Sequence, residues 1–244
     1  MTSTQKPKVS AAAQWLTLDG VTPGFTTNQA PLSRDLEGLA LRTLWTDGTL
    51  IDHNFGPDGL SWHYLTNHGD RRGYDPCQVF EIDKGLYYLQ FQRDDRPIEA
   101  PSVFFDLTRG VGLSVIATID DVTDGTMTVR HQFEPFIIEG HEPSSAKSPV
   151  LATDANGHTT CEIRPEIFVV TWREKVVPRG AVIITDERDQ LNPRSRGAVF
   201  GLDASGTETV HFTFATDGAD GDEGADGSLP RAMTSPPGKK GSHA

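Results

Sequence analysis

The sequence predicts an all-β protein with little helix, folded as a single antiparallel up-and-down β-barrel. Three observations support this prediction. No segment keeps a sustained 3.6-residue apolar period. Short alternating segments are separated by tight turns. One stretch also occurs twice, because Glu81–Arg93 aligns with Glu162–Glu174 without a gap. Two further apolar strands follow each copy, so we expect two related meanders around one core. Closing such strands into a barrel leaves no exposed sheet edge.

The elements are expected in the following order. The dipeptide Asp47-Gly48 lies between two alternating apolar runs, which is a strong hairpin signal. The strands and loops that we expect are a hairpin over 41–55, a strand over 60–66, a charged loop over 67–76, the first meander over 77–119, a long strand over 126–138, a polar surface loop over 139–158, the second meander over 159–202 and a last strand over 208–215. A barrel of this size holds about one small ligand.

Composition predicts one folded domain with unstructured ends. Residues 1–13 are small and polar, and we expect them to be disordered. Residues 14–216 are expected to form the single barrel domain. Residues 217–244 form a low-complexity acidic tail that cannot bury enough apolar area to fold.

The charge of the chain limits its partners. The formal net charge of −12 offers no basic stripe for nucleic acid or for an anionic membrane surface. No apolar run has the length of a membrane span, and the N-terminus lacks the apolar core of a signal peptide, so we expect a cytoplasmic protein. Cys77 and Cys161 are then expected to be reduced thiols rather than a disulfide.

Several motifs resemble one known family. The segment Trp172-Arg173-Glu174-Lys175-Val176-Val177-Pro178, followed by Gly197–Gly201, is similar to the C-terminal region of the MoaF family. The N-terminal domain of that family resembles Leu36–Ala117, with Leu36-Glu37-Gly38 and Leu60-Ser61-Trp62 in the same order. The resemblance implies a calycin-type, lipocalin-like barrel, and it implies little about chemistry.

A more distant likeness is to phenolic acid decarboxylases, which are also calycin barrels. Their Trp-x-Glu-Pro strand end resembles Trp172-Arg173-Glu174-Lys175, and the Glu of that motif is catalytic in those enzymes. The likeness therefore implies a catalytic role for Glu174. The Tyr-x-Tyr pair that grips the substrate carboxylate in those enzymes corresponds here to Thr43 and Trp45, so decarboxylation of a hydroxycinnamate is not implied.

Strand alternation selects the candidate catalytic residues. Glu174 shares a strand face with Trp172, and Arg93 ends the equivalent face of the first copy. If these faces line the lumen, Glu174 is a general acid or base, and Arg93 fixes a carboxylate or carbonyl of the ligand. His63 is a third candidate, as a proton shuttle. The alternative is that Arg93 and Glu174 lie at the rim in water or pair as a structural bridge.

Aromatic residues on the same faces are expected to bind the ligand. This set is Trp45, Trp62, Tyr64, Tyr87, Phe91, Phe168 and Trp172. We expect no metal, because no two histidines have the i, i+2 spacing of one strand face. We expect no cofactor either, because the Walker loop, the nucleophile elbow and the dinucleotide fingerprint are absent.

Three functions follow from these observations. The first is an enzyme without a cofactor, a lyase, isomerase or cyclase that applies acid/base chemistry to a small apolar or aromatic molecule. The second is a binder of the same molecules without catalysis. The third is a structural or interaction protein whose barrel is filled by side chains. A homodimer is compatible with each of them.

Overall fold

The computed structural model describes residues 30–66, 69–91, 93, 96, 98–122, 126–140, 151–153, 158–173, 178–189, 191, 193–201 and 213–214. The described residues contain strands and turns but no helix. Accordingly, no helix in this part of the chain has the length and apolar character that a membrane span requires. The expected disordered ends, 1–13 and 217–244, lie outside the described residues.

The first eight strands form a closed barrel. In order they are β1 (Ala40–Trp45), β2 (Leu50–Phe55), β3 (Gly59–Thr66), β4 (Gly69–Asp83), β5 (Leu86–Phe91), β6 (Glu99–Asp106), β7 (Val111–Val122) and β8 (Thr126–Ile138). Each strand pairs antiparallel with the next, and β8 returns to pair with β1 through Thr43 opposite Ile138. Alternation along the strands then sends one set of side chains into the barrel and the other set outward.

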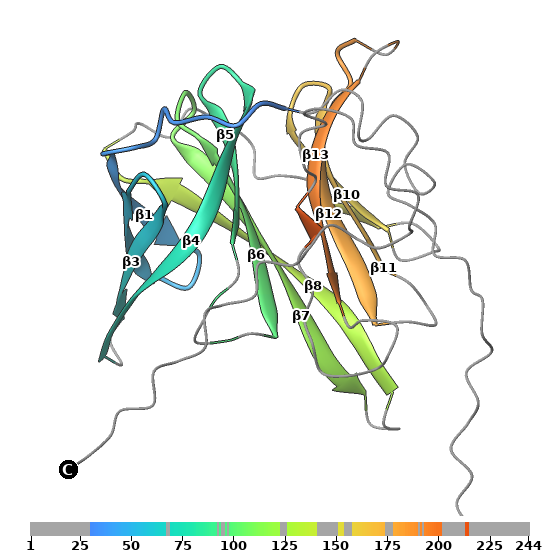
Figure 1. Ribbon diagram of the computed structural model, residues 1–244, viewed down its shortest axis with the longest axis horizontal. Coiled ribbons are helices and arrows are strands. Elements are labelled where there is room, and N and C mark those ends of the chain that lie inside the picture. Colours follow the sequence, from blue (N-terminus) through green and yellow to red (C-terminus); the bar gives the residue numbers. More distant parts are fainter. Residues whose placement is uncertain are drawn as a thin grey trace, which may run out of the picture.

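The remaining strands form a second sheet beside the barrel (Figure 1). They are β9 (Leu151–Thr153), β10 (Thr159–Arg164), β11 (Ile167–Arg173), β12 (Arg179–Asp186), β13 (Arg194–Gly201) and β14 (Thr213–Phe214). Their order in the sheet is β14-β13-β12-β11-β10-β9. The second meander therefore corresponds to β10–β13, and the first to β4–β7.

The prediction of an all-β chain with a closed antiparallel up-and-down barrel is confirmed. The prediction that both meanders share one barrel wall is wrong. The long strand β8 pairs with β7 along one edge and with β1 along the other, so the barrel closes before the second meander begins. With no free edge left in the wall, the second meander packs against the outside of the barrel.

Two expected loops contain strands. The charged segment 67–76 was predicted as a loop, but β4 begins at Gly69 and pairs with β3 from Gly69 to Pro76. Backbone hydrogen bonds to β3 hold this segment whatever its side chains are, and most of its side chains are exposed, which hides the alternation. The segment 139–158 likewise contains β9, which pairs with β10.

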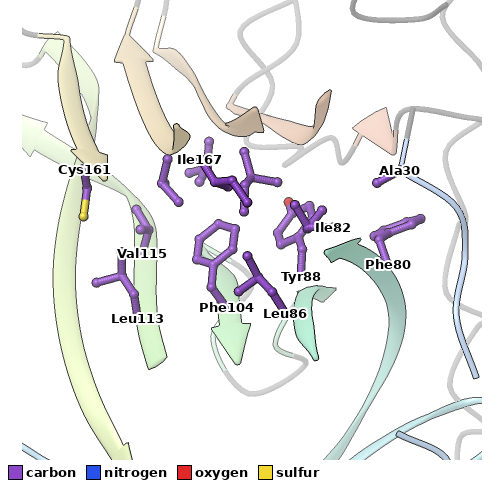
Figure 2. Packing of buried hydrophobic residues seen from close by; sticks show 13 residues of the cluster. Ala30, Phe80, Ile82, Leu86, Tyr88, Phe104, Leu113, Val115, Cys161 and Ile167 are labelled. Carbon is purple, nitrogen blue, oxygen red and sulfur yellow. The ribbon is translucent and has the colours of Figure 1, made fainter. Parts of the chain in front are cut away.

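Two apolar layers lie on opposite sides of the barrel wall. Inside the barrel, the aromatic rings of Phe55, Phe105 and Phe136 pack together. Outside it, the rings of Tyr88 and Phe104 stack with 5.0 Å between centroids, in a layer between the barrel and the second sheet (Figure 2). The second sheet contributes to this layer Cys161, Ile167, Val169, Val182 and Ile184. Strand β5 is buried on both faces because it contributes to both layers. Cys77 and Cys161 are free thiols, as expected.

Arginines join the second sheet to the barrel at one end of the shared layer. Arg164 of β10 lies 2.6 Å from Asp83 and 2.7 Å from Asp106, and its side chain is only 12% exposed. Arg188 adds a second contact to Asp83, at 3.0 Å. Asp83 and Arg164 occupy the same position in the two aligned copies of the repeat, so equivalent residues of the two meanders pair with each other.

Candidate ligand-binding site inside the barrel

The barrel encloses a cavity of about 450 Å³. Its walls come from all barrel strands except β4, and the turn between β1 and β2 adds Thr46, Asp47 and Thr49. A volume of this size accommodates a small organic molecule. The third predicted function required a barrel filled by side chains, and the cavity is inconsistent with that requirement.

Four of the predicted ligand-binding aromatic residues line this cavity: Trp45, Trp62, Tyr64 and Phe91. Trp62 and Tyr64 lie two positions apart on the same face of β3. Their rings meet edge to face, with 5.1 Å between ring centroids. The indole Nε1 of Trp62 donates a hydrogen bond to the buried carboxylate of Asp75, at 2.5 Å. The indole of Trp45 donates to Thr43 Oγ1, at 2.8 Å. The polar edges of both indoles are thus satisfied within the wall, which fixes the orientation of the rings.

Arg93 follows β5 and also lines the cavity, as predicted. It is only 8% exposed. Its guanidinium carbon lies 5.5 Å from the ring centroid of Trp62 and 5.9 Å from that of Tyr64, within cation–π range. Glu99 Oε2 lies 3.5 Å from Arg93 Nη1, so a carboxylate accompanies the arginine charge.

Glu134 of β8 is a cavity residue that the sequence prediction missed. The side-chain amide of Gln132 donates a hydrogen bond to Glu134 Oε1. Burial raises the pKa of Glu134, and the negative charges of Asp47 and Glu99 raise it further, while the Gln132 hydrogen bond acts in the opposite direction. A carboxyl group with a raised pKa is suited to acid/base chemistry near neutral pH.

His53 of β2 is a second missed residue. It shares the inward face of its strand with the buried Ile51 and Phe55, and its ring meets Phe105 edge to face at 5.4 Å. Burial lowers the pKa of His53 to about 4, although the nearby carbonyls of Ile51 and Leu41 oppose this shift. The imidazole is therefore neutral at physiological pH. Its Nδ1 atom has no hydrogen-bond partner among the described residues.

The other predicted site residues lie elsewhere. Tyr87 belongs to the apolar cluster inside the barrel but does not line the cavity, and its hydroxyl donates to Asp35 at 3.3 Å. His63 does not line the cavity, because it lies on the opposite face of β3 from Trp62 and Tyr64. Its Nε2 lies 3.4 Å from Asp70. Phe168 and Trp172 lie in β11 of the second sheet, outside the barrel. Glu174 lies outside the described residues.

Trp172 belongs to the face of the second sheet that points away from the barrel. Its neighbours there are Ala181, Ile183 and Val199. The opposite face of β11, with Ile167 and Val169, packs against the barrel. The expectation that Phe168 and Trp172 help to line the barrel lumen is therefore wrong, because the second meander is not part of the barrel wall.

The histidines of the described strands lie on different faces. Among the described residues, no group of three His, Cys, Asp or Glu side chains is arranged to hold a metal ion. His53 lines the cavity, His63 points away from it, and His131 lies against the second sheet, where a Cβ on Gly180 would be 2.9 Å from its ring. Three histidines on separate faces cannot share one ion.

The missed residues had a usable signal in the sequence. In β8, Glu134 lies on the same face as Phe136 and Ile138, which are buried inside the barrel. In β2, His53 likewise lies on the same face as the buried residues Ile51 and Phe55. A polar residue between apolar residues of one strand face is a candidate for the lumen, provided that the inner face is known.

Comparison with known proteins agrees with the two-part architecture. Residues 13–121 match the family described as the MoaF N-terminal domain, and residues 149–220 match the family described as the MoaF C-terminal domain. No curated protein matches the chain significantly. The N-terminal match includes β1 to β6 and most of β7, and the C-terminal match includes β9 to β14.

Proposed function

The chain belongs to the MoaF family, and we propose that it binds a small, partly aromatic molecule inside the barrel. The observation that carries this proposal is the cavity of about 450 Å³ with four aromatic side chains on its wall. Apolar pockets with a few polar groups are typical of small-molecule sites. Here the polar groups are Arg93, His53 and Glu134, which come from three different strands or strand ends.

The proposal is tested by filling the cavity. Val103 is buried and points into the cavity, so Val103→Trp places an indole in that space. The probe is the neutral fluorophore N-phenyl-1-naphthylamine, with excitation transfer from Trp45 and Trp62. Wild-type protein should bind one probe per chain, and Val103→Trp should weaken binding at least about tenfold. The control is Leu44→Trp, which adds an indole at a position 43% exposed on the outside of β1.

The outcomes separate binding in the barrel from binding elsewhere. Equal probe affinity in wild type, Val103→Trp and Leu44→Trp would contradict the proposal. Loss of affinity only in Val103→Trp, with an unchanged unfolding midpoint, would support it. A second measurement is the native mass of protein purified from its own host, in which a retained molecule would appear directly.

A second candidate function is catalysis of proton transfer without a cofactor. The observation that favours it is the raised pKa of Glu134 inside the same aromatic cavity. A partly desolvated carboxylate is a stronger base than one in water. The predicted acid Glu174 remains a separate proposal, since it lies outside the described residues.

The catalytic proposal is tested with 5-nitrobenzisoxazole, a neutral aromatic substrate that reports on carboxylate bases. A carboxylate removes the proton on C3 while the N–O bond breaks, and the product is a coloured cyanophenolate. We expect turnover in wild type that Glu134→Gln reduces at least about tenfold. Glu174→Gln measures the role predicted from the sequence, and Glu139→Gln is the control, because Glu139 is exposed beyond the end of β8.

Equal rates in wild type, Glu134→Gln and Glu174→Gln would contradict catalysis and would leave the binding proposal standing. The cytoplasmic location and the lack of nucleic-acid and membrane partners remain predictions from the sequence, and a homodimer remains compatible with each function.

A further inference from the structure

We propose that the molecule bound in the barrel carries a protonated amine, which Glu134 and Asp47 hold while its apolar part contacts the aromatic wall. This inference rests on the proposed binding function and specifies the charge of the ligand.

The charged groups of the cavity are unbalanced. Three residues with formal charge line it: Arg93, Asp47 and Glu134. Arg93 already faces a carboxylate, because Glu99 lies 3.5 Å away and both side chains are largely buried, at 9% and 14% exposed. Glu99 also pairs with Arg96, at 2.9 Å, which does not line the cavity. Among the residues that line the cavity, two carboxylates therefore outnumber one cation: Glu134 is partly buried, and Asp47 is exposed at the turn between β1 and β2.

Neither of these two carboxylates has an internal counterion. Among the described residues, Asp47 and Glu134 form no ion pair with any Lys, Arg or His. Glu134 accepts a hydrogen bond from the neutral amide of Gln132, and Asp47 accepts one from the backbone amide of Thr49. Burial raises the pKa of Glu134, and the negative charges of Asp47 and Glu99 raise it further. A ligand cation would relieve this unfavourable arrangement.

His53 provides an independent indication that a polar ligand occupies this space. It is 6% exposed and lines the same cavity, and its buried Nδ1 has no hydrogen-bond partner among the described residues. A buried polar atom without a partner is costly unless a ligand or a water molecule supplies one. Because the imidazole is neutral at physiological pH, it cannot act as a counterion for Glu134.

An anionic ligand fits the same groups less well. A ligand carboxylate bound to Arg93 would have to compete with Glu99, which is already beside the guanidinium. It would also enter a cavity that Asp47 and Glu134 make negative. Like charges at close range disfavour binding, whereas an ammonium group gains charge-assisted hydrogen bonds from the same carboxylates.

Three probes of equal length and shape test this inference: 4-phenylbutylamine, 4-phenylbutanol and 4-phenylbutyrate. They are cationic, neutral and anionic at pH 7. Binding is measured by calorimetry on the full chain and by quenching of the cavity tryptophans. We expect the amine to bind at least about tenfold more tightly than the alcohol, and the acid to bind most weakly.

The variant Glu134→Gln keeps the shape of the side chain and removes its charge. It should bring amine and alcohol affinities to within about threefold of each other and leave alcohol affinity unchanged. The control Glu139→Gln removes an equal charge from an exposed position outside the cavity and should keep the wild-type preference.

Each outcome has one meaning. Tightest binding of the acid, or equal binding of amine and alcohol in wild type, overturns the inference and leaves the binding function intact. An equal loss for all three probes in Glu134→Gln shows a structural role and also overturns it. Failure of all three probes to bind overturns both the inference and the proposed function.

Discussion

The two meanders of this protein have the same construction and different surroundings. In the first, Leu86 pairs with Asp106 and the β4–β5 register shifts between Glu81 and Asp83. In the second, Ile167 pairs with Asp186 and the β10–β11 register shifts between Glu162 and Arg164. These positions are equivalent in the repeat. Strand pattern alone therefore specifies the meander, and it does not specify whether the meander encloses a cavity.

The difference lies in what covers the face of each meander that points away from the other meander. One face of each meander packs against the other meander, with Leu86 and Tyr88 on one side and Ile167 and Val169 on the other. The opposite face of β5 is enclosed by the other barrel strands and contributes Phe91 to the cavity. The opposite face of β11 carries Trp172 on an open sheet. Closure by additional strands, rather than the repeat itself, creates the candidate site.

The largest effect is expected from breaking the junction between the meanders with Arg164→Ala. This substitution leaves Asp106, which is 6% exposed, and Asp83 without their shortest ion pairs. We expect a loss of about 3 kcal/mol in the free energy of unfolding, at the lower end for a buried pair, because Arg109 and Arg188 remain near these carboxylates. Urea denaturation measures the loss.

A matched control for the junction is Arg130→Ala. Arg130 pairs with Asp120 at 2.5 Å, but these side chains are 55% and 37% exposed. An exposed pair contributes about 0–1 kcal/mol. Equal losses in Arg164→Ala and Arg130→Ala would show that the junction does not hold the second meander to the barrel.

Lowering the pH compares the cavity with the layer between the meanders. Burial lowers the pKa of both His53 and His131 to about 4. The unfolded chain, whose histidines titrate near pH 6.5, binds protons more readily, so stability falls as the pH drops from about 6.5 to about 4. Each histidine should account for a loss on the order of 2–3 kcal/mol across this window.

The variants His53→Gln and His131→Gln separate these two contributions. Each should reduce the slope of unfolding free energy against pH, measured in urea between pH 7 and 4.5. Only His53→Gln should also change probe binding, because His53 lines the cavity and His131 does not. Unchanged slopes in both variants would contradict the burial of neutral imidazoles.

A smaller loss of stability is expected from substituting Trp62, which lies inside the barrel, or Trp172, which lies on the face of the second sheet that points away from the barrel. Trp62→Phe removes the hydrogen bond from the indole to the buried carboxylate of Asp75, at a cost of about 1–3 kcal/mol. Trp172→Phe should cost less than about 1 kcal/mol, because Trp172 Nε1 is buried without a partner in the described part of the chain. Thermal unfolding ranks the two variants; the reverse order would mean that the face of β11 is the more tightly specified.

Part of the candidate site could be predicted from strand alternation. Trp62 and Tyr64 are two positions apart on one strand, and Phe91 and Arg93 are two positions apart at the end of another. Each pair therefore shares a strand face, and this places all four residues on the cavity wall once the inner face is known. His63 was expected to serve as a proton shuttle, although the same alternation that brings its neighbours into the cavity directs it outward. Glu134 and His53 were missed because alternation does not say which face is inside.

The sequence by itself determined the class of structure: an all-β chain, a closed antiparallel barrel, a repeated meander and four aromatic residues of the cavity wall. Local turn signals and strand periodicity suffice for these features, because both depend on neighbours along the chain. Only the tertiary structure decided that eight strands close the barrel and that the second meander packs outside it. That choice depends on the pairing of β8 with β1, a contact between residues distant in sequence that no local pattern records.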